Sequence, residues 1–137
     1  MAGPLAARLA AERAAEREIA TLNSWYDEMR AHMGARKLFI AADIQFHAAI
    51  FAASQNELLQ QLNGTIGGAF RASQNIVRGI RRGSALALPV HRAVAEAIGR
   101  HDGPAAQAAM ADLVKQATLH LYQALRPAKP GDLRRRR

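Results

Sequence analysis

The sequence contains no cysteine, so it can form neither a disulfide framework nor a thiolate site for metal or redox chemistry. Aromatic residues are also scarce, at 5% of the chain, although half of all residues are hydrophobic. Alanine is prominent among the hydrophobic residues, and this balance favours packed helices over β-sheets. The sequence therefore predicts a helical protein without cysteine chemistry, for which the cytoplasm is the default location.

Long apolar runs are absent as well. No stretch approaches the roughly 20 apolar residues that a membrane-spanning helix needs. Residues 1–5 lack the basic start and apolar core of a signal peptide. We therefore expect no membrane partner. At 137 residues, the chain is long enough for one domain with a core of its own.

The positive charge is unevenly distributed. Residues 126–137 contain six basic residues and one acid, so they carry five of the eight net positive charges and leave three for the other 125 residues. This segment also contains two prolines and a glycine but no apolar periodicity. We expect it to be a disordered basic tail that is solvated, with non-specific contact to nucleic acid or acidic lipid as the alternative.

Apolar residues recur at helical spacing through most of residues 1–125, and no segment alternates with period two for long enough to form a strand. Ser54, Gln55 and Asn56 mark a break, with Asn56 as the N-cap of the next helix. Pro89 is expected in the first turn of a helix that begins near Leu88. The sequence predicts one all-α domain, an antiparallel bundle of about six helices over approximately 5–20, 21–33, 36–53, 57–82, 88–101 and 104–125.

Two polar side chains lie on an otherwise apolar helix. Asp43 and His47 are four residues apart, so their side chains share one helix face beside Ile44, Phe46 and Ile50. Burying such groups without partners costs several kcal/mol. A metal ion or an anionic ligand inside the bundle would account for them. A simple local hydrogen bond, or a solvated face, is the alternative reading of the same pair.

The order of residues resembles the FCD domain, the ligand-binding domain of fatty-acid-regulator-type GntR transcription regulators. The first part of the resemblance is the helix that runs from Leu5 to Ala14. The rest is carried by Asp43-x-x-x-His47-x-x-Ile50-x-x-x-Ser54-x-Asn56 and, after a long helix, by His91-x-x-Val94-x-x-Ala97-Ile98-x-x-x-Asp102-x-x-x-Ala106-x-x-Ala109-Met110. The resemblance covers about residues 5–125.

The resemblance implies a sensor that dimerises and encloses a pocket for a small molecule, usually an organic acid. Many such domains hold a divalent metal with one aspartate and three histidines, and Asp43, His47 and His91 match the first three ligands. The fourth position is occupied by Leu113, while His120 lies about 10 Å further along the helix. Two readings stay open: a three-ligand site for zinc, nickel or manganese with a position left for a carboxylate, or a chain that has lost its metal.

A row of polar side chains supplies candidate ligand contacts. Arg71, Asn75 and Arg78 fall at helical spacings of three or four and share a face, and the chain has no acid between Glu57 and Glu96. An arginine in this row could bind a ligand carboxylate through two hydrogen bonds. The alternative is a solvated basic face. His32 and His101 are interpreted as surface residues, and neither is assigned a role.

Signs of catalysis are weak, because the sequence has no nucleophile elbow, no phosphate-binding glycine loop and no two-cysteine metal motif. We assign no catalytic residue and expect a protein that is not an enzyme. No stretch reads as a winged helix-turn-helix, so contact with DNA would require a further domain. The alternative function is a helical interaction and dimerisation module without metal or ligand, with a basic tail for an acidic partner.

Overall fold

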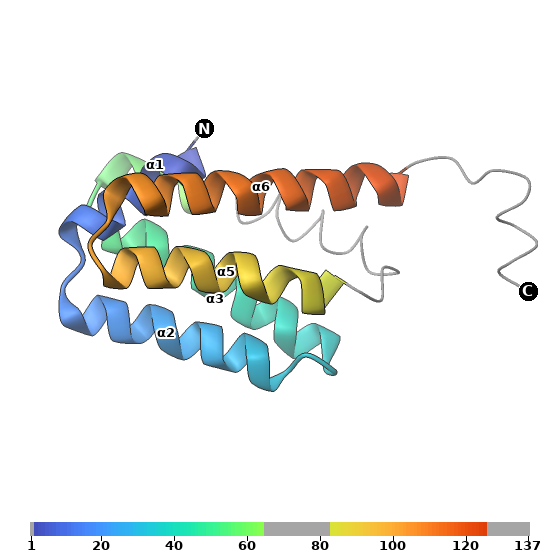
Figure 1. Cartoon of the computed structure of the whole chain (residues 1–137). Helices are drawn as coiled ribbons and strands as arrows, with labels where there is room; N and C mark the ends of the chain where they lie inside the picture. Colours follow the sequence, from blue (N-terminus) through green and yellow to red (C-terminus); the bar gives the residue numbers. More distant parts are fainter. Residues whose placement is uncertain (1, 65–82, 126–137) are drawn as a thin grey trace, which may run out of the picture.

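The computed structural model describes residues 2–64 and 83–125, and they form an all-α bundle (Figure 1). Residues 57–64 are also helical. No strand occurs within these two ranges, which confirms the predicted fold class. None of the described helices combines the length and the apolar character that crossing a membrane requires. The named helices are α1 (Ala2–Arg13), α2 (Glu16–Ala31), α3 (Arg36–Ala53), α5 (Gly83–Gly99) and α6 (Gly103–Leu125).

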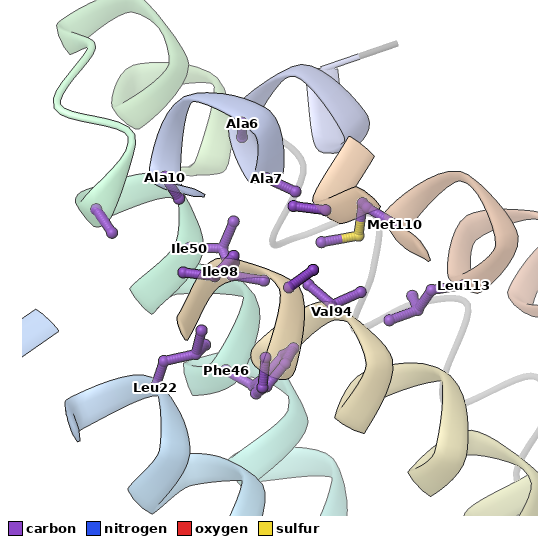
Figure 2. Close-up of a cluster of buried hydrophobic side chains, with 14 of the residues drawn as sticks. Ala6, Ala7, Ala10, Leu22, Phe46, Ile50, Val94, Ile98, Met110 and Leu113 are labelled. Atoms are coloured by element: carbon purple, nitrogen blue, oxygen red, sulfur yellow. The ribbon is translucent and has the colours of Figure 1, made fainter. Parts of the chain in front are cut away.

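Helix α2 packs antiparallel to α3, and α5 packs antiparallel to α6 (Figure 1). Helix α1 packs on α6 through a face of small residues, because Ala6, Ala7 and Ala10 are fully buried and let the two backbones approach closely. Helix α3 contributes Phe46 and Ile50 to the largest fully buried apolar side chains, α5 contributes Val94 and Ile98, and the others come from α2 and α6 (Figure 2). Helices α3 and α5 therefore face each other across the core through side chains, while their backbones pack more closely on other helices, α3 on α2 and α1, and α5 on α6 and α2.

Helix α3 begins and ends where the sequence predicted, at residues 36 and 53. The side chain of Asn56 accepts a hydrogen bond from the backbone N–H of Leu59 at 3.1 Å, which confirms Asn56 as the N-cap of the next helix. That helix was predicted to continue to residue 82, and residues 65–82 lie outside the described ranges. The predicted basic tail, residues 126–137, lies outside them too.

The predicted boundary between the first two helices was wrong. The break falls at Ala14 and Ala15 rather than after residue 20. Alanine favours helix, so local propensity gave no signal for a break here. The N-terminus of α2 is instead stabilised by Glu18, whose carboxylate accepts a hydrogen bond from the backbone N–H of Ala15 at 3.0 Å.

The C-terminal end of α1 is capped by side chains from two other turns. The side-chain amide of Gln55 donates to the carbonyl oxygen of Arg13, and Nδ1 of His101 donates to that of Ala11, both at 2.9 Å. Both capping residues have positive φ angles, 53° and 57°. His101 is exposed, as the sequence predicted, but its side chain also satisfies a carbonyl that the helix leaves without a partner, a structural role that the sequence did not suggest.

The start of α5 was also predicted incorrectly. The helix begins at Gly83, so Pro89 lies within it rather than in its first turn. Proline removes one backbone donor and usually distorts a helix. Here its ring is exposed while Leu88 before it is buried, and packing of the apolar face keeps the segment helical.

Gln55 offers a test of the cap on α1. We expect Gln55→Ala to lower the free energy of unfolding by about 1–2 kcal/mol, because two side-chain hydrogen bonds, to Arg13 and Glu18, are lost while the left-handed backbone remains. Gln55→Gly should lose less, because glycine adopts positive φ without strain. Urea unfolding would measure both variants. Equal losses of stability in the two variants, or no loss in either, would contradict the view that both the hydrogen bonds of Gln55 and its left-handed backbone affect stability.

Candidate functional site

Asp43, His47 and His91 meet between α3 and α5. The Oδ1 atom of Asp43 lies 2.7 Å from Nε2 of His91 and 3.2 Å from Nε2 of His47. On α3, Asp43 and His47 share a face with the fully buried Ile50. On α5, His91 lies on the face of the fully buried Val94. Burial of these two apolar faces therefore brings the polar groups together.

The orientation of the His91 ring is set by the backbone of its own helix. Its Nδ1 atom lies 2.7 Å from the carbonyl oxygen of Ala87, which can only accept, so Nδ1 carries a proton. A neutral imidazole has no second proton, and its Nε2 would then present a lone pair to the carboxylate of Asp43. At 2.7 Å the two atoms share a proton, and the same two lone pairs could instead bind one metal ion.

Electrostatics keep Asp43 ionised despite its burial. Burial alone would raise the pKa of Asp43, but the charge of His91 and hydrogen bonds from both histidines hold it well below its usual range. Burial alone would lower the pKa of His91, and the carboxylate of Asp43 raises it above its ordinary value. The centre thus contains a buried carboxylate that attracts positive charge.

The three side chains fit a divalent transition metal. Their candidate ligand atoms all lie within 4.8 Å of one another. Zinc, nickel and manganese accept imidazole nitrogen and carboxylate oxygen, and ligands about 2.1 Å from the metal lie roughly 3 Å apart. The bond from Nδ1 of His91 to a carbonyl is the outer contact that metal-binding histidines usually make.

The described ranges provide no fourth ligand. No other histidine, aspartate or glutamate in them joins the three residues. Leu113, at the position where the resemblance implies a ligand, is an apolar member of the core (Figure 2). His120 does not belong to the cluster. Any remaining coordination position would be available to water or to a ligand.

The predicted ligand contacts Arg71, Asn75 and Arg78 lie outside the described residues. Sequence reasoning also missed Phe46, whose ring lies 5.0 Å from the ring of His91 and 5.8 Å from that of His47, measured between centroids. The sequence contained a signal for this contact. Phe46 follows Asp43 by three residues, which puts both on one helix face, and it directly precedes His47.

The comparisons with known proteins agree with the fold. Residues 3–116 match the FCD domain family. The chain is 34% identical over 121 residues to the galactonate operon transcriptional repressor of Escherichia coli (strain K12), across 88% of this chain and 53% of that protein. It also resembles the solved structure of Streptococcus agalactiae GntR, with a TM-score of 0.71 and 20% identity over 85% of this chain and 52% of that one.

Since the family match covers most of the chain, the protein belongs to the FCD domain family found in GntR-type transcription regulators. The chain spans about half the length of the two proteins that it matches. The curated relative is a transcriptional repressor, in agreement with the expectation that this chain is not an enzyme.

Proposed function

We propose that this chain is the effector-sensing and dimerisation domain of a GntR-type transcription regulator in the cytoplasm. In this proposal, Asp43, His47 and His91 bind one divalent metal, and a small organic acid binds beside it. The observation that carries the proposal is the buried convergence of a carboxylate and two imidazoles, with Nδ1 of His91 already bound to a carbonyl.

A bound metal would supply positive charge and open coordination positions for carboxylate oxygens. The three protein ligands leave such positions unfilled within the described residues. The similar protein from Escherichia coli is named as the repressor of a galactonate operon, and galactonate is a sugar acid. This supports a carboxylate as the class of effector. Arg71, Asn75 and Arg78 remain predicted contacts for it.

Binding of the effector would change how two protomers pack and so alter the spacing of the DNA-reading domains attached to them. A ligand shifts such an equilibrium only by its difference in affinity for the two states. A ligand between α3 and α5 would touch two helices whose side chains meet in the core. The homodimer and the contact with DNA through a separate winged-helix domain are parts of the proposal.

The metal content of untagged protein, purified without chelators, tests the proposal first. We expect close to one divalent ion per chain by elemental mass spectrometry, and loss of that ion in His91→Ala. His120→Ala is the matched control, because His120 lies outside the cluster and should leave the metal content unchanged.

Thermal denaturation with a panel of organic acids, including galactonate, then tests the sensor. An acid that stabilises wild-type protein should fail to stabilise His91→Ala. Wild-type protein that refuses added zinc, nickel and manganese would refute the metal site. If no acid stabilised it either, the helical interaction module without ligand would become the better account.

A further inference from the structure

Three rings pack against one another at the candidate centre. Phe46 is fully buried, and its ring meets those of His91 and His47 edge to face, at interplanar angles of 63° and 79°. The two imidazoles are themselves nearly perpendicular, at 85°, with centroids 5.4 Å apart. In the part of the chain that the structure describes, no other aromatic residue contacts both imidazoles.

We propose that Phe46 is a positioning residue that sets the direction of both Nε2 atoms, an inference that rests on the proposed metal site. Each imidazole can rotate about its bond to Cβ, and such terminal torsions have broad minima. An edge-to-face contact is directional, because the aromatic ring has a negative face and a positive edge. The contact with Phe46 therefore restricts each imidazole to a narrower range of tilt.

The restriction by Phe46 matters more for His47 than for His91. His91 is already held through Nδ1 by the carbonyl of Ala87, so Phe46 only supports one flank of its ring. His47 lies on the same helix as Asp43, and its side chain remains 17% exposed. Phe46 follows Asp43 by three residues and precedes His47 directly, so the helix backbone fixes the order of carboxylate, ring and imidazole.

Comparison of Phe46→Leu with Phe51→Leu separates positioning from simple core filling. Phe51 lies on the same helix and is also buried, but it makes no ring contact with either imidazole within the described residues. Both variants lose a similar apolar volume, so both should lower the melting temperature. Phe46→Met provides a second ring-less variant, because methionine fills irregular gaps in cores.

The first readout is nickel affinity, measured by competition with a chromophoric chelator. We expect Phe46→Leu and Phe46→Met to weaken nickel binding by about 10- to 100-fold, the range typical of residues that orient metal ligands, and Phe51→Leu to change it less than threefold. Equal affinity in the two leucine variants would overturn the proposal.

The second readout needs no metal. In ¹⁵N-labelled, metal-free protein, the imidazole nitrogen resonances of His47 and His91 should shift or broaden in the Phe46 variants and stay unchanged in Phe51→Leu. If wild-type protein bound no metal, the proposed metal function would fail while these spectra still decided the role of Phe46. Imidazole resonances that changed equally in all the variants would show that Phe46 only fills the core.

Discussion

Asp43→Ala is expected to abolish metal binding and to destabilise the metal-free protein by about 3 kcal/mol. Asp43 contacts both histidines, and its Oδ1 atom lies within 3.2 Å of each Nε2. Removing one partner of a buried ion pair typically costs about 3–5 kcal/mol, because the other charge stays buried. The loss should fall at the low end, because His91 can release its proton. Urea unfolding of chelator-treated protein measures the stability.

Asp43→Asn is the matched variant, because it keeps the shape of the side chain without its negative charge. A neutral His91 can keep its Nδ1–H on the carbonyl of Ala87 while its Nε2 atom accepts a hydrogen bond from the side-chain amide of an asparagine at position 43, so the contact survives without the charge. We expect an intermediate loss of stability and nickel binding weakened at least as much as in His91→Ala. Nickel affinity close to that of wild-type protein in Asp43→Asn would refute a charge-dependent metal site.

The helices could be predicted where a local signal ends them. Gly34 and the break at residues 54–56 gave the bounds of α3, because glycine and asparagine act within their own turns. The break between α1 and α2 has no such signal. The end of α1 is stabilised by Gln55 and His101, which are distant in sequence, so only the folded chain shows it. The start of α5 could not be predicted for the same reason, because a helix tolerates Pro89 in its interior only where packing leaves the proline ring exposed.

The candidate site, like the helices, could be predicted only in part from the sequence. The spacing of Asp43 and His47 is enough to put them on one helix face, and the structure shows them there. His91 comes from a different helix, 48 residues after Asp43, and it entered the prediction through the family resemblance. The carbonyl of Ala87 could not be predicted, since every residue carries that group and only the rotamer of His91 selects one. The arginine row remains a prediction.

Leu113→His is expected to strengthen metal binding by on the order of 100-fold, equivalent to about 2.7 kcal/mol. Leu113 belongs to the same buried cluster as Val94, which lies one turn from His91, and the resemblance places a histidine ligand at this position. Without metal, the same substitution should cost about 2 kcal/mol, since it buries a polar ring in an apolar site. Chelator-treated and zinc-loaded protein should therefore shift in opposite directions in thermal denaturation.

Leu113→Asn separates the two effects, because asparagine brings comparable polarity to the site but is a poor ligand for zinc. It should lose stability without metal and gain no affinity. A fourth protein ligand would also close a tetrahedral zinc site, so any stabilisation by an organic acid should decrease in zinc-loaded Leu113→His. If acid binding stayed undiminished while zinc affinity rose, the acid would have to bind without occupying the coordination position that Leu113 leaves open. If zinc affinity did not rise, Leu113 would not lie within reach of the metal.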